Sequence, residues 1–283
     1  MKILFSAFLI MLTTQLFAQK PIEIELWPDG APNTNELTGE EVTADGGRVS
    51  NVTHPTLFVY RAAQPTGMAV IACPGGGYAR LSMNNEGHDH ADWYNAQGIT
   101  FVVLKYRMPN GHKEVPLSDA EQAIRIVRSH AEEWGIDPHR VGIMGSSAGG
   151  HLAASLATLY SSEETRPDFQ ILFYPVITMQ NATHAGSRDN LLGKEADDEL
   201  LQAYSLDTRV NEQTPPAFIM LSADDTAVPP VTNGIAYYIA LTQNHVPSTL
   251  HCYPTGGHGW GYRESFTYKR QWTGELEKWL RLF

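Results

Sequence analysis

Short apolar runs, separated by amphipathic helical patterns, constrain the fold of this chain more than any other feature. Several runs are apolar at every position, as expected of strands that are covered on both faces. Strands and helices alternating in this way predict an α/β domain with a mostly parallel sheet. The runs are Ile22–Leu26, Thr56–Tyr60, Met68–Cys73, Ile99–Tyr106, Val141–Gly145, Phe169–Tyr174, Ala217–Leu221 and Ser248–Tyr253.

The clearest helical pattern covers Leu117–Trp134. Its apolar residues recur at steps of three and four, which places them on one helix face. Ser118 and Glu121 have the spacing of a capping box at the start of this helix. Gly135 can supply the left-handed residue that ends it.

Two further helices and one long connection complete the pattern. A helix is expected directly after Ser147, and another near Phe266–Phe283. The connection from Val176 to Pro215 is unusually long and holds a weak helical pattern at Asp197–Tyr204. Because long connections in compact domains are usually functional, we expect this segment to form part of the active-site wall.

The first 18 residues have the three parts of a secretory signal peptide. A positive start at Lys2 precedes the apolar run Ile3–Leu12, and the small residue Ala18 marks the expected cleavage point. The run is too short for a permanent membrane anchor. We therefore expect a secreted or periplasmic protein whose residues 19–283 form a single catalytic domain without stable membrane insertion.

Charge and cysteine content narrow the possible partners. The formal net charge is −11, and loss of Lys2 with the signal peptide makes the mature chain more negative still. An acidic chain is a poor candidate for binding nucleic acid or anionic membranes. Cys73 and Cys252 end two separate apolar runs, so we expect two buried free thiols rather than a disulfide.

A Gly-x-Ser-x-Gly motif centred on Ser147 is the strongest chemical signal. The run Val141–Gly145 leads directly into it and a helical pattern leaves it, which is the strand–turn–helix context of a nucleophile elbow. The flanking glycines permit a turn too sharp for side chains. We expect the Ser147 hydroxyl to be lifted to the carboxyl end of the sheet as a nucleophile.

A nucleophilic serine needs a base and an acid. His258 lies in the glycine-rich stretch Gly256–Gly259 after the last apolar run, and it is the expected base. Asp224 and Asp225 follow the run Ala217–Leu221, where the acid is expected, and either could orient the histidine. The other aspartate would then cap the loop.

The triple glycine after Cys73-Pro74 is the candidate oxyanion loop. Consecutive glycines expose backbone amides, so we expect Gly76 or Gly77, together with the Ala148 amide, to hold a tetrahedral oxyanion. Lipases and esterases carry a His-Gly-Gly-Gly-type loop here, and Pro74 replaces that histidine. A phosphate-binding loop is disfavoured because no lysine follows the glycines.

A metal site is the competing interpretation. His88, His90 and Asp92 have the His-x-His-x-Asp spacing of some zinc hydrolases, but Trp93 stands where a further histidine would usually follow. We therefore expect no metal and no cofactor, with these polar residues on the solvated face of a helix.

With these motifs placed, the chain resembles the α/β-hydrolase-fold carbohydrate esterases, particularly the acetylxylan esterase-like group of polysaccharide-degrading bacteria. The resemblance implies an eight-stranded sheet with helices on both faces. It favours Asp225 as the acid, because in related enzymes the acid stands four residues before a proline, here Pro229. The motifs that carry it span nearly all of the mature chain: Leu26–Pro28, Cys73–Tyr78, Leu104–Arg107, Trp134–Pro138, Gly150–Leu152, Tyr174–Val176 and Gly256–Gly259.

The resemblance also implies the reaction. The expected function is removal of acetyl groups from acetylated xylan or a similar plant polysaccharide through an acyl-enzyme. One alternative is a feruloyl or other small-acyl carbohydrate esterase, which differs only in its acyl pocket. Another is a serine exopeptidase of the prolyl oligopeptidase type, although such enzymes usually carry a large extra domain. A non-catalytic binding protein would typically have lost one member of the triad.

Overall fold

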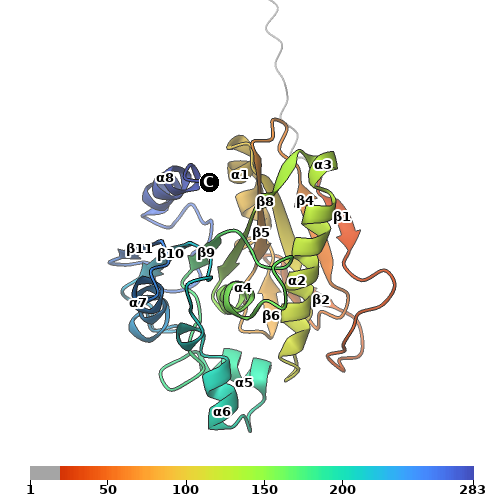
Figure 1. The fold of residues 1–283 in the computed structure, drawn as a ribbon. Helices are drawn as coiled ribbons and strands as arrows, with labels where there is room; N and C mark the ends of the chain where they lie inside the picture. The colour runs from red at the N-terminus through yellow and green to blue at the C-terminus, as the bar shows by residue number, and fades with distance from the viewer. Residues whose placement is uncertain (1–19) are drawn as a thin grey trace, which may run out of the picture.

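The computed structural model describes residues 20–283, so the predicted signal peptide lies outside the described residues (Figure 1). Each predicted strand forms, and together they make one eight-stranded sheet in the order β1-β4-β7-β5-β8-β9-β10-β11. The strands are β1 (Ile22–Glu25), β4 (Thr56–Tyr60), β5 (Gly67–Cys73), β7 (Thr100–Lys105), β8 (Ile136–Ser146), β9 (Gln170–Phe173), β10 (Ala217–Ser222) and β11 (Ser248–Tyr253).

The sheet is mostly parallel, as predicted. Strand β4 pairs antiparallel with both β1 and β7, and the pairs from β7 through β5, β8, β9 and β10 to β11 are all parallel. Every residue of β9 and β10 is buried, so both faces of the sheet centre are covered. The carboxyl ends of these parallel strands therefore share one edge, where their loops can meet.

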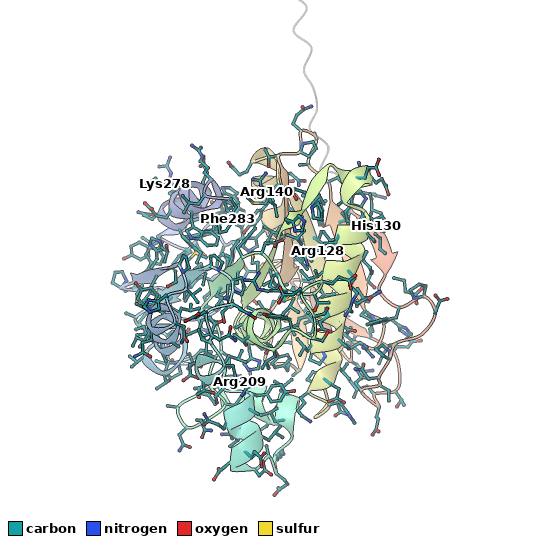
Figure 2. The ribbon with its side chains drawn as sticks, in the orientation of Figure 1. Arg128, His130, Arg140, Arg209, Lys278 and Phe283 are labelled. Carbon is teal, nitrogen blue, oxygen red and sulfur yellow. The ribbon has the colours of Figure 1, made fainter. Side chains whose placement is uncertain are left out.

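Helices cover the two faces. Trp93 of α1 and Trp272 of α8 approach to 6.2 Å between ring centroids, and α2 packs on α4. Figure 1 shows α2 and α4 in front of the strands, and Figure 2 shows side chains filling the space between them. No helix among residues 20–283 is long and apolar enough to cross a membrane. The helices are α1 (Ala91–Ala96), α2 (Glu114–Ser129), α3 (Ala131–Trp134), α4 (Ala148–Leu159), α5 (Ala185–Leu192), α6 (Asp198–Ala203), α7 (Ala236–Gln243) and α8 (Lys269–Leu280).

The predicted helix Leu117–Trp134 differs from the observed one at both ends. Helix α2 begins earlier, at Glu114, and His130 separates it from the short α3, which ends at the left-handed Gly135 as predicted. The predicted capping box is wrong, because Ser118 lies inside the helix and donates to the Val115 carbonyl at 2.8 Å. Glu121 instead accepts from the Ser161 amide at 2.6 Å, which ties α2 to the loop after α4.

A second sheet was not predicted. It is antiparallel, has the order β2-β3-β6, and consists of β2 (Val42–Ala44), β3 (Arg48–Ser50) and β6 (Arg80–Ser82). Strands of three residues carry too little alternation to be recognised in the sequence. This sheet joins a segment near the N-terminus to the residues that follow the triple glycine.

The two thiols are free, as predicted, but only Cys73 is buried. Cys252 is exposed, which corrects the expectation that both are buried. The difference follows from their strands, because β5 lies inside the sheet and β11 is its edge.

Candidate active site

Ser147 stands at a sharp turn between β8 and α4. Its backbone has φ 54° and ψ −121°, a strained conformation for a residue with a side chain. A Cβ on Gly145 would lie 2.0 Å from the Gly149 carbonyl oxygen, and one on Gly149 would lie 2.0 Å from the Cys73 carbonyl oxygen. Only glycine fits at these two positions, so the sharp turn that presents Ser147 depends on both glycines.

Ser147, His258 and Asp225 form one chain of contacts. Ser147 Oγ lies 2.8 Å from His258 Nε2, and His258 Nδ1 lies 2.6 Å from Asp225 Oδ2. Because an ionised carboxylate only accepts, Nδ1 donates to Asp225, and Nε2 of the neutral ring is left to accept the serine proton. The arrangement can therefore increase the nucleophilicity of the Ser147 hydroxyl.

The two adjacent aspartates have different contacts. Asp225 is buried, and its second oxygen accepts from the Ala227 and Val228 amides at 2.9 Å each. Asp224 is exposed and accepts from the Gly257 amide at 2.8 Å and the Gly256 amide at 3.2 Å. The Gly257 amide is the main cause of the lowered pKa of Asp224. Asp225 thus contacts the imidazole. Asp224 instead ties its own loop to residues 256–261, which we call the histidine loop.

Two of the predicted oxyanion donors, Gly76 and Gly77, line the same cavity as Ser147. Neither the Gly76 nor the Gly77 amide finds an acceptor among residues 20–283, whereas the Gly75 amide donates to Glu86. Ala148 is the first residue of α4, and amides in the first turn of a helix have no partner within that helix. Gly76 has φ 140°, and a Cβ there would lie 2.2 Å from the Arg80 carbonyl oxygen. These amides can donate to an oxygen beside Ser147.

Glu86 and Tyr174 connect the two glycine-rich loops, and the sequence did not point to this role. Glu86 is buried, accepting from the Gly75 amide and from the Tyr174 hydroxyl at 2.8 Å each. The Tyr174 hydroxyl in turn accepts from the Gly261 amide at 2.8 Å, and its ring lies 4.8 Å from that of His258 between centroids. Burial raises the pKa of Glu86, and the bond from Tyr174 is the main opposing influence. The carboxyl group therefore fixes the oxyanion loop relative to the histidine loop.

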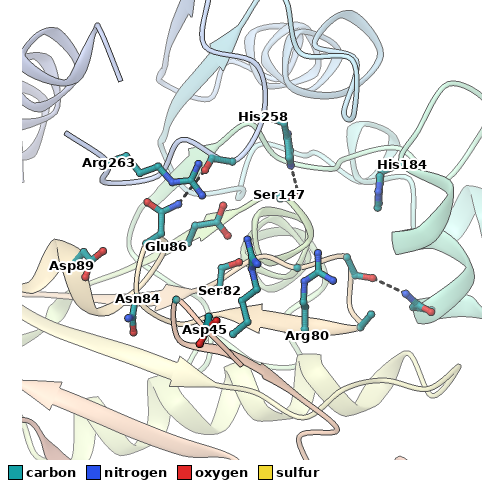
Figure 3. A pocket seen from close by; sticks show the side chains of 18 residues that line it. Asp45, Arg80, Ser82, Asn84, Glu86, Asp89, Ser147, His184, His258 and Arg263 are labelled. Carbon is teal, nitrogen blue, oxygen red and sulfur yellow. Dashed lines mark hydrogen bonds between the residues drawn. The ribbon is translucent and has the colours of Figure 1, made fainter. Parts of the chain in front are cut away.

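A cavity of about 810 Å³ lies in front of Ser147 and is lined largely by polar side chains (Figure 3). One part of the lining comes from the strand-end loops, and the other from the three-stranded sheet and the Val176–Pro215 connection. We call these last two elements the cleft wall. Figure 1 shows α5 and α6, which belong to that connection, beyond one end of the large sheet. The side chains lining the cavity include Asp45, Arg48, Arg80, Ser82, Asn84, Asn85, Glu86, Asp89, Ser147, His184, Asn190, His258 and Arg263.

The expected wall role of the Val176–Pro215 connection is confirmed. His184, just before α5, and Asn190, within it, both line the cavity. Asn190 donates to the Gly77 carbonyl at 2.8 Å, so the wall also holds the oxyanion loop. Burial lowers the pKa of His184, and the nearby His258 lowers it further.

The His88–Asp92 segment does not build a metal centre. No three His, Cys, Asp or Glu side chains within residues 20–283 gather as a metal ion would need. His88 packs against Phe58, whereas His90 is fully buried in an aromatic cluster that includes Tyr262. The expectation of a solvated face is therefore wrong for His90, because its element turns it into the core beneath the histidine loop.

Comparisons with known proteins agree with this fold. Residues 70–261 match a family described as alpha/beta hydrolase fold. The chain is 46% identical to an acetylxylan esterase of Xylanibacter ruminicola over 229 residues, which is 80% of this chain and 48% of that protein. It is 35% identical to endo-1,4-beta-xylanase B of Butyrivibrio fibrisolvens over 72% of this chain and 34% of that protein. The chain thus spans half or less of the length of these curated relatives.

A solved structure matches over almost the full length of both chains. It is the acetyl ester-xyloside bifunctional hydrolase from Caldicellulosiruptor lactoaceticus, with a TM-score of 0.79 and 33% identity. The match covers 93% of this chain and 96% of that one. The similarity therefore extends over nearly the whole fold and is not confined to the central motif.

Proposed function

The chain belongs to the alpha/beta hydrolase fold family, and on this premise we propose that it is a secreted serine esterase that removes acetyl groups from acetylated xylan or a similar plant polysaccharide. The observation that carries the proposal is the contact of Ser147 Oγ with His258 Nε2 at 2.8 Å, in front of a polar cavity. Residues 1–18 are removed as a signal peptide, and residues 19–283 form one catalytic domain.

The first half of the reaction forms an acyl-enzyme. His258, oriented by Asp225, accepts the Ser147 proton as the serine oxygen attacks the ester carbonyl carbon. The amides of Gly76, Gly77 and Ala148 hold the resulting oxyanion, and one such donor stabilises the transition state by about 3 kcal/mol. The carbonyl re-forms, His258 returns the proton to the departing sugar oxygen, and the acetyl group stays on Ser147.

The second half regenerates the enzyme. A water molecule attacks the acetyl carbonyl while His258 accepts its proton, and the Ser147 oxygen leaves with that proton as acetate is released. No cofactor takes part in either half. The base and the donors serve both halves, because attack and departure occur at the same carbon.

The cavity lining supports a small acyl group on a sugar. Within the described residues no Phe, Tyr or Trp lines the cavity, whereas an aromatic acyl group such as ferulate needs apolar or aromatic walls. Charged and amide side chains predominate, and these can hydrogen-bond to sugar hydroxyls. The names of the relatives, an acetylxylan esterase and an acetyl ester-xyloside hydrolase, support the same substrate class.

The test is acetate release from acetylated xylan by the mature protein. Ser147→Ala should abolish release, with a loss of about 10⁴-fold or more. Ser129→Ala is the matched control, because this serine is exposed at the last residue of α2 and does not line the cavity. It should keep most of the activity.

Parallel substrates separate the alternatives. Feruloylated xylan, a proline-containing peptide and a small activated acetate ester should be tested beside acetylated xylan. Faster release of ferulate, or faster cleavage of the peptide, would replace the proposal with the corresponding alternative. Inertness toward every ester would indicate a non-catalytic binding protein instead.

A further inference from the structure

The three-stranded sheet presents two arginines to the cavity. In its register Arg48 lies opposite Ser82 and Ser50 lies opposite Arg80, so both arginines occupy one face of the sheet. Val49 and Leu81 alternate with them and are buried on the other face. Arg48, Arg80 and Ser82 all line the cavity. The strand alternation therefore fixes these guanidinium groups on the substrate side.

Arg80 lies directly beside the oxyanion loop. A Cβ built on Gly76 would come within 3.0 Å of Arg80 Cγ, so the stem of the arginine touches the position of a predicted oxyanion donor. Figure 3 shows the Arg80 side chain pointing into the cavity, between Ser82 and His184. One substrate molecule in the cavity could therefore present its ester to Ser147 and a second group to Arg80.

Neither arginine has a protein partner. Among residues 20–283, neither the Arg48 nor the Arg80 guanidinium forms an ion pair within 4.0 Å or a hydrogen bond. The buried Arg107, in contrast, is paired with Asp119 at 2.7 Å. Arg48 and Arg80 are diagonal neighbours on paired strands, so their like charges repel each other, although solvent screens this repulsion.

The acidic residues of the lining do not neutralise this pair. Glu86 is engaged by Gly75 and Tyr174, and Figure 3 shows it beside Arg263. In the same view Asp89 lies at the left edge of the lining, with Asn84 and Ser82 between it and Arg80. Asp45, on the turn after β2, is the acidic residue nearest in sequence to Arg48, but it forms no ion pair with it within 4.0 Å.

We propose that Arg48 and Arg80 bind a carboxylate carried by the substrate, so that the preferred substrate class is an acetylated oligosaccharide bearing a uronic acid. This inference rests on the proposed esterase function. The planar guanidinium fork matches a carboxylate through two parallel hydrogen bonds, and an anion between the two arginines also relieves their repulsion. Neutral acetylated sugars still reach Ser147, but they leave the pair unsatisfied.

The experiment compares two forms of one substrate. Acetate release is measured on an acetylated xylo-oligosaccharide that carries a glucuronic acid branch, and on the same compound with its carboxyl group reduced to an alcohol. The wild-type protein should prefer the acid form by about fivefold to tenfold in kcat/KM. High salt should reduce this preference, because both arginines are exposed to solvent.

Three variants assign the preference to the pair. Arg48→Gln and Arg80→Gln should each lower kcat/KM on the acid form by about fivefold, with little change on the reduced form. Arg270→Gln removes the same charge from an exposed site on α8 and should leave the ratio unchanged. Equal wild-type rates on the two forms, or a ratio unaffected by either cavity variant, would overturn the inference.

A small activated acetate ester separates the two possible failures. If the wild-type protein cleaves this ester but shows no preference for the acid form, the carboxylate subsite is wrong and the esterase function still holds. If the wild-type protein cleaves neither this ester nor the acid form, the proposed esterase function itself is wrong.

Discussion

The two parts of the cavity are built in different ways. The strand-end loops after β5, β8, β10 and β11 hold Ser147, Asp225 and His258 through backbone amides and buried side chains. The cleft wall, made of the three-stranded sheet and the Val176–Pro215 connection, offers exposed side chains such as Arg48 and Arg80. The groups of the strand-end loops are held by hydrogen bonds to other residues, whereas the arginines of the cleft wall are free to meet a ligand.

In this account the strand-end loops carry out the reaction, and the cleft wall selects the substrate. Proton transfer and oxyanion binding need preorganised groups, so each residue in the strand-end loops is held by others. Recognition of a large, hydrated sugar is served by longer side chains whose contacts form only in the complex. Substitutions in the loops should therefore reduce turnover on every ester, and substitutions in the wall should alter substrate preference.

The sharpest test within the strand-end loops compares the adjacent aspartates. Asp225→Asn should lower kcat/KM on a small activated ester by about 10⁴-fold, because the asparagine amide favours the wrong tautomer of His258. Asp224→Asn should lower it less than about tenfold, since an amide oxygen can still accept from Gly257. Equal losses in the two variants would show that the acid is not specific to Asp225.

The next effect concerns the connection between the loops. Glu86→Gln should lower kcat on the small ester by about 10- to 100-fold with little change in KM. Gly75 and Tyr174 donate to different oxygens of the carboxylate, and in glutamine one of these oxygens is replaced by an NH2 group, which cannot accept. Glu132→Gln, at an exposed site on α3 outside the cavity lining, serves as the control. A purely structural role for Glu86 would lower the free energy of unfolding while leaving kcat per folded molecule unchanged.

The smallest expected effect concerns His90, in the core beneath the histidine loop. It changes the free energy of unfolding and not the turnover rate. Burial lowers the pKa of His90 to about 3, and neither of its ring nitrogens has a hydrogen-bond partner within the described residues. The unfolded chain binds a proton at this side chain below about pH 6.5, whereas the folded protein does not until about pH 3. The wild-type protein therefore loses stability as the pH falls through this window.

Replacing His90 tests this account. His90→Leu should unfold at higher urea concentration than the wild type, and its advantage should grow by up to about 1.4 kcal/mol for each pH unit below 6.5. His151, whose pKa is lowered to about 4 by burial, keeps part of the acid sensitivity in the variant. Urea titrations at pH 7, 6 and 5 measure the difference, and parallel curves for the two proteins would contradict it.

The same contrast explains what the sequence could predict. The strands of the large sheet are long enough to be recognised in the sequence from their apolar residues. All eight predicted strands form. The contact of Ser147 with His258 could be predicted because glycines flank both residues at sharp turns. The choice of Asp225 over Asp224 came instead from the family resemblance, through the position of Pro229.

Other features could not be predicted, for identifiable reasons. The three-stranded sheet has strands of three residues, which carry no usable period. Ser118 and Glu121 matched a capping box by spacing alone, but Pro116 is tolerated in the first turn and the helix starts before both. Glu86 and Arg80 are single polar residues in loop-like sequence, and their roles depend on neighbours that only the folded chain supplies.

The most direct test of the central claim is to find where the acyl group rests during turnover. The mature protein would be mixed with a small activated acetate ester, quenched in acid and digested, and the peptide carrying Ser147 would be examined by mass spectrometry. The proposed mechanism predicts an added acetyl group on Ser147 that appears during turnover and is absent from Ser147→Ala. An acetyl group on another residue during turnover, or acetate release undiminished in Ser147→Ala, would contradict it.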